Sequence, residues 1–300
     1  MPLKDVALAV LVQVIWAVGL TSMKPAMEGA YPPLLFIALA YGIVALVLTP
    51  ITPRSTTPFW WMSLIALLGG SGQSCLLALG VTLLPASTST LLLQLTVPFA
   101  VLMSWAVRID RPSWRNGIGC LVSLIGVAIV IGAPGEDYSW FGILAVAAAA
   151  LAWALAQVLI RLRAKGSGAT FYGAMARHAA PHALIASLIF EQDQVGVLAR
   201  ASLGNWAALL AIAILGFAGG YVLWYRLLVR NRIDHLLPFT LLMPPIGVAS
   251  AVMWQDEALH ASLLLGGLVI VLGLAVIVWP TRRRRSDPAP GRPEAVGRVP

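Results

Sequence analysis

The feature that most constrains the fold of this chain is the length of its segments without Asp, Glu, Lys or Arg. A helix needs roughly 20 apolar residues to cross the hydrocarbon core of a bilayer, and these segments approach or exceed that length. Hydrophobic residues make up 59% of the chain and charged residues 11%, whereas about a quarter of a soluble domain is charged. The sequence therefore predicts an all-α integral membrane protein. The segments are 6–23, 29–53, 55–107, 116–135, 138–160, 201–225, 235–255 and 258–281, and 166–190 is interrupted only by Arg177.

The segment 55–107 is too long for a single crossing. As one helix it would extend roughly 80 Å, against a bilayer core of about 30 Å. The chain must turn back within it, and we expect the turn between Gly80 and Pro85, because both residues interrupt helices. Ten transmembrane helices are expected, at 6–23, 31–50, 59–79, 86–107, 116–133, 138–160, 168–190, 203–225, 236–255 and 261–279.

The second half of the chain repeats the first. Adding 147 to the residue number relates 69–126 to 216–273 without a gap, and an offset of 137 relates the preceding part, so we expect a longer loop in the second copy. The matched pairs are Gly69 and Gly216, Gly72 and Gly219, Pro98 and Pro245, Asp110 and Glu257, Gly119 and Gly266, Gly126 and Gly273, Trp16 and Trp153, and Lys24 and Arg161. The predicted organisation is a first repeat at 1–134, a second at 135–280 and a disordered Arg- and Pro-rich tail at 281–300.

The distribution of Lys and Arg predicts how the chain lies in the membrane. With ten crossings and a cytoplasmic N-terminus, 17 of the 20 Lys and Arg residues are cytoplasmic, and two, Lys24 and Arg200, lie outside. Positively charged loops favour the cytoplasmic side, so both termini are expected there. Each repeat then holds five helices, an odd number, so the repeats enter the membrane in opposite orientations. Inverted repeats are typical of transporters that open alternately to the two sides of a central site.

Several motifs resemble one transporter family. They are Trp16 with Lys24, Tyr31-Pro32-Pro33, Gln94-Leu95-Thr96-Val97-Pro98, Asp110-Arg111 and the Gly-rich fifth helix. Together they resemble the EamA-type branch of the drug/metabolite transporter superfamily over about residues 5–280. Within that branch, the segment from Gly220-Tyr221-Val222-Leu223-Trp224 to Asp256-Glu257 is most similar to the O-acetylserine/cysteine exporters.

This resemblance implies a multi-pass protein of a bacterial inner membrane that exports a small polar metabolite, such as an amino acid or a derivative, by alternating access. The chain departs from the family at Ala40, where an Arg is common, although the second half keeps Arg177. A multidrug efflux protein of the same fold remains an alternative, but it would be expected to carry an acidic residue in the first helix. A membrane-embedded enzyme is a more remote one, because the acidic residues are scattered.

Arg177 is the sharpest candidate for a functional residue, because a charge at the centre of a membrane helix costs about 2.5–3.5 kcal/mol on insertion scales. Its guanidinium could hold a substrate carboxylate, or it could lock the bundle by donating to backbone carbonyls. His178 and His182 lie one turn apart on the same helix and could have a proton-sensitive role. Two histidines without a third ligand make a poor metal site, so no metal is expected.

Other candidates form polar stripes with helical spacing. Ser87, Thr90 and Gln94 lie on one face of the fourth helix, where they could line a cavity or bind helices together. Trp153 and Gln157 form a similar pair on the sixth helix. With Trp16 of the first helix and Tyr221 of the eighth, the predicted substrate-binding residues are Trp16, Ser87, Thr90, Gln94, Trp153, Gln157, Arg177 and Tyr221.

The positions of the twelve acidic residues limit the ways in which transport could be coupled to an ion gradient. All of them fall in predicted loops, helix ends or the tail, so no carboxylate is available within the bilayer to relay protons or hold sodium. We therefore expect a facilitator or exchanger driven by the gradient of the solute, with a histidine-coupled proton route as the alternative. No catalytic residue, cofactor or nucleic-acid partner is expected, and the expected partners are a small-molecule substrate and the lipid bilayer, with the protein a monomer or homodimer.

Overall fold

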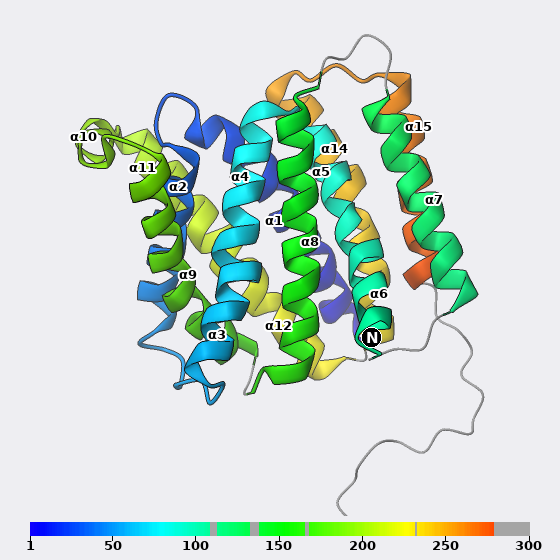
Figure 1. The fold of residues 1–300 in the computed structure, drawn as a ribbon, viewed down its shortest axis with the longest axis horizontal. Coiled ribbons are helices and arrows are strands. Elements are labelled where there is room, and N and C mark those ends of the chain that lie inside the picture. The colour runs from blue at the N-terminus through cyan, green and yellow to red at the C-terminus, as the bar shows by residue number, and fades with distance from the viewer. Residues whose placement is uncertain (109–112, 133–137, 166–167, 232, 279–300) are drawn as a thin grey trace, which may run out of the picture.

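The computed structural model describes residues 1–108, 113–132, 138–165, 168–231 and 233–278, and within these ranges the chain forms helices and no strand (Figure 1). The helices run side by side as a bundle (Figure 1). In chain order they are α1 (Leu3–Met27), α2 (Pro33–Leu48), α3 (Phe59–Ala66), η1 (Leu67–Gly72), α4 (Gln73–Leu83), α5 (Ala86–Leu92), η2 (Leu93–Leu95), α6 (Thr96–Ala106), α7 (Trp114–Ile131), α8 (Trp140–Arg163), α9 (Gly168–Phe190), α10 (Gln194–Arg200), α11 (Leu203–Ala211), η3 (Ile212–Gly219), α12 (Gly220–Arg230), α13 (Ile233–Leu236), η4 (Leu237–Leu242), α14 (Met243–Gln255) and α15 (Ala261–Val278).

Several of these elements join end to end into longer rods. Among the described residues, seven helical rods are long and apolar enough to cross a membrane, and α2 is a shorter apolar helix of 16 residues. The seven rods are Leu3–Met27, Phe59–Leu83, Ala86–Ala106, Trp114–Ile131, Trp140–Arg163, Leu203–Trp224 and Ala261–Val278.

The turn inside the long apolar segment lies at the end of the predicted range. Gly80 lies within α4, and the helix continues to Leu83 before the chain turns at Leu84 and Pro85. A Cβ at Gly80 would lie 2.3 Å from Cγ2 of Val146, so this glycine allows α4 to approach α8 closely. The expected turn between Gly80 and Pro85 is confirmed, and Gly80 itself serves the packing of α4 against α8.

The extra length of the second half lies mostly in a helix rather than in a loop. α9 has 23 residues, whereas α2, at the corresponding place in the first half, has 16. The connection after α9 also contains the short helix α10, which the sequence did not predict. At about 1.5 Å per residue, α2 is roughly 24 Å long and shorter than a bilayer core.

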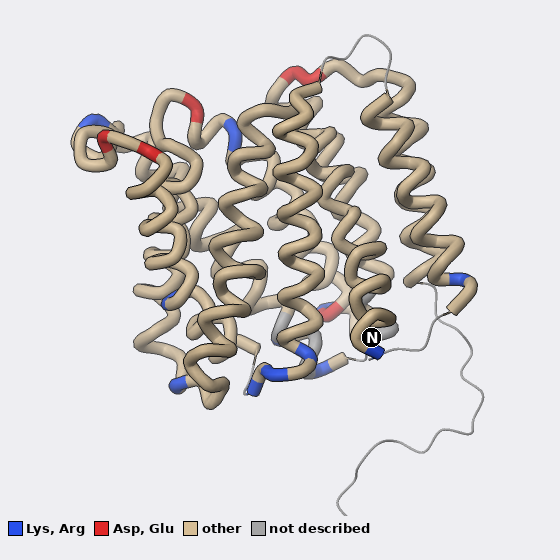
Figure 2. Tube along the Cα trace, viewed as in Figure 1, with Lys and Arg blue, Asp and Glu red and all other residues tan. Residues whose placement is uncertain are grey.

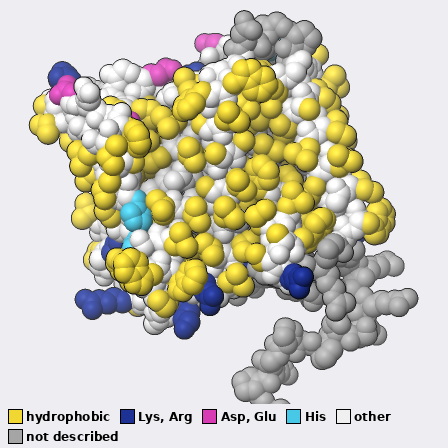
Figure 3. Space-filling view, viewed as in Figure 1, with side chains coloured by type: hydrophobic (Ala, Val, Ile, Leu, Met, Phe, Trp, Pro, Cys, Tyr) yellow, Lys and Arg dark blue, Asp and Glu magenta, His cyan; other side chains and the backbone are white. Residues whose placement is uncertain are grey.

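The charged residues gather at the two ends of the bundle (Figure 2). The end that holds the N-terminus, here called the basic end, carries mainly Lys and Arg, and the opposite, acidic end carries most of the Asp and Glu shown (Figure 2). Between the ends, the visible face is covered largely by hydrophobic side chains (Figure 3). This distribution is the one expected of a bundle surrounded by lipid with its ends in water.

Glycines bring α7 and α15 into close antiparallel contact. A Cβ at Gly126 would lie 2.8 Å from the carbonyl oxygen of Gly266, and one at Gly119 would lie 2.7 Å from that of Gly273. Any larger residue would separate the two backbones. The four glycines belong to matched pairs of the internal repeat, since Gly119 corresponds to Gly266 and Gly126 to Gly273.

Irregular helical turns also recur in the two halves. The π-helical segments η1 and η3 end at Gly72 and Gly219, which are 147 residues apart. The 3₁₀ segments η2 and η4 each precede a proline, Pro98 or Pro245, that cannot donate a backbone hydrogen bond. Such interruptions often mark hinges or functional sites.

Candidate functional site

Tyr221 of α12 is the centre of an aromatic cluster that joins four helices. Its ring stacks on that of Tyr172 of α9, with centroids 4.4 Å apart and an angle of 14° between planes. It also lies 5.1 Å from the ring of Trp16 of α1 and 6.2 Å from that of Trp153 of α8. The structure thus brings together three of the predicted substrate-binding residues. The sequence did not single out Tyr172, because local spacing does not reveal which face of α9 meets α12.

A buried amide lies next to this cluster. Gln13 is three residues before Trp16 on α1, a step that places both on one helix face. Its side chain is 0% exposed, and neither amide atom has a hydrogen-bond partner among the described residues. The indole nitrogen of Trp16 is likewise buried without a partner among them. Leaving a buried polar group unsatisfied costs about 1–3 kcal/mol, so these groups are poised to bind a polar ligand.

Gln13 is not among the predicted site residues, although its position in the sequence carries a signal. The glutamine stands in the middle of an apolar helix and one turn from Trp16, which was itself a candidate. The same spacing drew attention to Trp153 and Gln157 on α8, where Gln157 is half-buried.

The polar stripe of α5 and η2 is buried, with α5 packed against α14 and η2 against α8. Ser87, Thr90 and Gln94 are 2%, 0% and 9% exposed. The hydroxyl of Thr90 donates to the carbonyl of Ala86 at 2.8 Å, and a Cβ at Gly247 would lie 2.5 Å from Cγ2 of Thr90. Thr90 is therefore in tight contact with α14. Gln94 lies in η2, immediately before α6, which contains Pro98.

Two glutamates cap helices at the acidic end. The carboxylate of Glu257 accepts hydrogen bonds from the backbone nitrogens of Ala86 at 2.5 Å and Ser87 at 3.1 Å, at the start of α5. The carboxylate of Glu191 accepts from those of Leu34 at 2.7 Å and Leu35 at 2.9 Å, at the start of α2. A carboxylate at a helix N-terminus satisfies free N–H groups and complements the helix dipole. Each cap joins the second half of the chain to the first.

Further hydrogen bonds close the acidic end around α1. The side chain of Gln255 donates to the carbonyl of Thr21 at 2.7 Å, and the hydroxyls of Thr21 and Ser250 lie 2.9 Å apart. These bonds tie α1 to α14 next to the Glu257 cap. The sequence placed Glu257 outside the bilayer but gave no indication that it caps α5.

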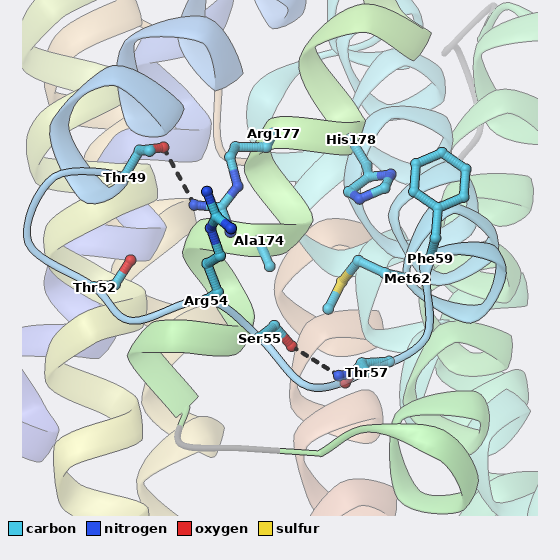
Figure 4. A pocket seen from close by; sticks show the side chains of 10 residues that line it. All are labelled: Thr49, Thr52, Arg54, Ser55, Thr57, Phe59, Met62, Ala174, Arg177 and His178. Carbon is cyan, nitrogen blue, oxygen red and sulfur yellow. Dashed lines mark hydrogen bonds between the residues drawn. The ribbon is translucent and has the colours of Figure 1, made fainter.

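Arg177 lies apart from the other predicted residues, in a cavity of about 700 Å³ between α9, α3 and the connection that follows α2 (Figure 4). Its Nη1 donates to Oγ1 of Thr49 at 3.3 Å. This bond joins two side chains, so it differs from the expected lock onto backbone carbonyls. The cavity is lined by Thr49, Thr52, Arg54, Ser55, Thr57, Phe59, Met62, Ala174, Arg177 and His178.

The two histidines of α9 have different neighbours. The ring of His178 lies 4.9 Å from that of Phe59, and Nε2 of His182 lies 3.1 Å from Oγ of Ser63. Among the described residues, no group of three or more His, Cys, Asp or Glu side chains is arranged to hold a metal ion. Asp110, Arg111 and the tail at 281–300 fall outside the described residues.

The apolar helices, with most charges gathered at the two ends of the bundle around a polar and aromatic centre, are those of a multi-pass membrane protein. The model of the EamA-like transporter family matches residues 3–132 and again residues 140–279. The chain therefore belongs to the EamA-like transporter family.

Relatives match this chain over nearly its full length. It is 27% identical over 292 residues to a protein of Salmonella typhimurium named a probable amino-acid metabolite efflux pump, covering 94% of this chain and 97% of that protein. It is 25% identical, with the same coverage, to the Escherichia coli protein of that name. It is 26% identical to a probable terminal-alkyne amino-acid exporter of Streptantibioticus cattleyicolor, over 96% of this chain and 98% of that protein. A solved crystal structure matches with a TM-score of 0.64 at 19% identity, over 91% of this chain and 96% of that one, which shows a shared fold.

Proposed function

We propose that this protein exports an amino acid or a close derivative across the bacterial inner membrane by alternating access. The proposal is supported by full-length similarity to bacterial proteins named amino-acid metabolite efflux pumps and an amino-acid exporter. The structural observation that carries it is the aromatic cluster around Tyr221, which joins α1 of the first half to α8, α9 and α12 of the second beside the unsatisfied amide of Gln13.

In this proposal, the substrate binds at the cluster. The amide of Gln13 can donate to a carboxylate or accept from an ammonium group, and the indole nitrogen of Trp16 is an additional donor. An ammonium group can also lie over the faces of Trp153 and Tyr221 through a cation–π contact. Gln94 and Gln157 would contribute polar contacts on the neighbouring helices.

We further propose ten membrane helices in two inverted repeats, with both termini cytoplasmic. The close glycine contacts support the inversion, because Gly119 with Gly273 becomes Gly266 with Gly126 when the two halves are exchanged. The two matches of the family model also support a duplicated chain. The orientation is supported by the concentration of Lys and Arg at the end of the bundle that holds the N-terminus.

The gradient of the substrate itself would drive transport. Among the described residues, the acidic side chains belong to connections or to the first turns of helical rods, as in the case of Asp5, which accepts from Nδ2 of Asn231 at 2.8 Å. No carboxylate of the described part is therefore placed to carry protons through the bilayer centre. Strict proton coupling that persists in a variant lacking both His178 and His182 would contradict this mechanism.

The decisive experiment measures efflux from proteoliposomes loaded with a panel of labelled amino acids. We expect the protein to release a subset of the panel faster than empty liposomes do. The variants Tyr221→Ala and Gln13→Ala should lower this rate at least about tenfold, the effect of losing one strong substrate contact. Trp60→Ala, which changes a side chain that is 80% exposed on the outer surface, is the matched control and should transport normally.

Two outcomes of this experiment would contradict parts of the proposal, one its substrate class and the other its binding site. Release of a cationic dye without release of any amino acid would favour multidrug efflux and contradict the proposal. Normal amino-acid efflux by Tyr221→Ala and Gln13→Ala would retain the substrate class but exclude the cluster as its binding site.

A further inference from the structure

Two arginines line the cavity at the basic end without an acidic partner. Arg54 and Arg177 extend into the same space from the connection after α2 and from α9 (Figure 4). The ion pair found among the described residues is that of Arg200 with Asp193, at the other end of the bundle, and no described carboxylate lines this cavity. Two neighbouring positive charges repel each other, so an anion between them would stabilise both.

The walls of this cavity are polar on the side of the connection. Oγ1 of Thr52 donates to the carbonyl of Leu48 at 2.6 Å, and Oγ1 of Thr57 accepts from the backbone nitrogen of Lys165 at 2.8 Å. Non-helical backbone at this depth is tolerated where it lines a hydrated cavity or is buried in protein. The short α2 therefore creates a recess in which two guanidinium groups and the hydroxyl group of Thr49, which accepts from Arg177, face a space that an oxyanion can enter.

An apolar groove begins at the same arginine. Its volume is about 600 Å³, and its lining residues are Gly42, Ala45, Leu46, Thr49, Pro50 and Arg177. Leu46 is 78% exposed, so the groove lies on the outer surface of the bundle. A Cβ at Gly42 would meet no atom within 4 Å, so the groove is open there. From Arg177 the groove follows α2 away from the basic end.

We propose that these two adjoining spaces form a binding site for an anionic phospholipid. The phosphate is held between Arg54 and Arg177, and one acyl chain lies in the groove along α2 beside Gly42 and Leu46. A guanidinium group matches the geometry of phosphate oxygens. The two spaces follow each other as the parts of a lipid do. The cavity with the arginines lies at the basic end of the bundle, and the apolar groove extends from it toward the bilayer centre. Basic recesses between transmembrane helices are suited to such headgroups.

Native mass spectrometry of the detergent-purified protein with added dioleoylphosphatidylglycerol tests the site. We expect the wild type to retain this lipid in preference to dioleoylphosphatidylcholine. Arg54→Gln and Arg177→Gln should each weaken retention about tenfold, because each removes a charge-assisted hydrogen bond. Arg230→Gln removes an exposed arginine of α12 that does not line the cavity, so it should behave as the wild type. Arg54 is exposed, so its replacement leaves the fold intact, which the melting temperature checks.

The groove and the source of the anion are tested separately. Gly42→Leu places a side chain in open space, so it should fold normally and still lower phosphatidylglycerol retention. The proposal would be overturned if Gly42→Leu retained the lipid as well as the wild type and millimolar inorganic phosphate displaced it. In that case the two arginines would bind a free anion rather than a phospholipid. Unchanged retention by Arg54→Gln and Arg177→Gln would overturn it as well.

Discussion

At the scale of single residues, a buried polar group without a hydrogen-bond partner indicates a ligand-binding position better than one that is already bonded. Gln13 and Gln255 are both glutamines near α1, but only the second forms a hydrogen bond in the described structure, to the carbonyl of Thr21. Folding gains nothing from burying the amide of Gln13 without partners. Its presence in an apolar helix is therefore better explained by a ligand than by stability.

The variant Gln13→Leu separates these two roles. We expect its stability to be equal to or greater than that of the wild type, by up to about 1 kcal/mol, because an unsatisfied buried group is removed. Amino-acid efflux should fall at the same time. Thermal unfolding in detergent and efflux from proteoliposomes measure the two effects. Gln255→Leu is the matched control, since it loses a real hydrogen bond and should unfold at a lower temperature. A large loss of stability in Gln13→Leu would show that the amide is structural.

At the scale of elements, the helix caps of the acidic end connect the two halves of the chain. Glu257 precedes α15 in sequence but stabilises the first turn of α5, and Glu191 follows α9 but stabilises that of α2. A proline, Pro32 or Pro85, stands immediately before each capped helix, and the first N–H groups of any helix have no partner within the helix. In the proposed alternating access, opening of this end would break these bonds.

The variant Glu257→Ala removes one cap. We expect a loss of about 0.5–2 kcal/mol, the usual effect of losing an N-terminal cap. Glu257→Gln keeps an oxygen acceptor and should lose less. Hydrogen exchange should show faster exchange at Ala86 and Ser87 in the alanine variant. Asp256→Asn, at the neighbouring exposed position, is the control, because Asn tolerates the left-handed backbone conformation of Asp256. Unchanged exchange at the start of α5 would mean that the cap does not hold this end closed.

At the scale of the whole molecule, the separation of charges between the ends defines an axis for the bundle. The basic end carries connections rich in Lys and Arg, which favour the cytoplasmic side in the proposed orientation, and the acidic end carries Glu28, Asp193 and Glu257. The internal repeat, with its paired glycines and paired irregular turns, gives the two halves similar helices. A motion that opens one end could therefore be matched by an equivalent motion at the other.

Cysteine labelling tests this orientation. In a variant without Cys75 and Cys120, both buried and free, a single cysteine is placed at Glu28 or Asp193 of the acidic end or at Arg230 of the basic end. A membrane-impermeant thiol reagent added to intact cells should label positions 28 and 193 and spare position 230 until the cells are opened. Labelling of all three positions from outside would contradict the inverted repeats.

The sequence predicted the helices α2 and α9 but not the recess that forms where α2 ends. Apolar length and composition place α9 at 168–190 from sequence alone, and the structure has α9 at Gly168–Phe190. The sequence predicted 31–50 for the second helix, which is four residues longer than α2. This small difference at the ends opens the recess in which Arg177 meets Thr49.

The sequence by itself predicted the apolar helices of the bundle and the repetition of the chain, because a bilayer requires each crossing segment to be apolar, long enough and satisfied in its own backbone hydrogen bonds. The tertiary structure decided which side chains meet. Tyr221 reaches Tyr172, Glu257 reaches α5 and Arg177 reaches a recess beside α2, because these contacts depend on the rotation and relative depth of helices distant in sequence. Local spacing fixes the face of a helix on which a residue lies, but it does not fix the neighbour that this face meets.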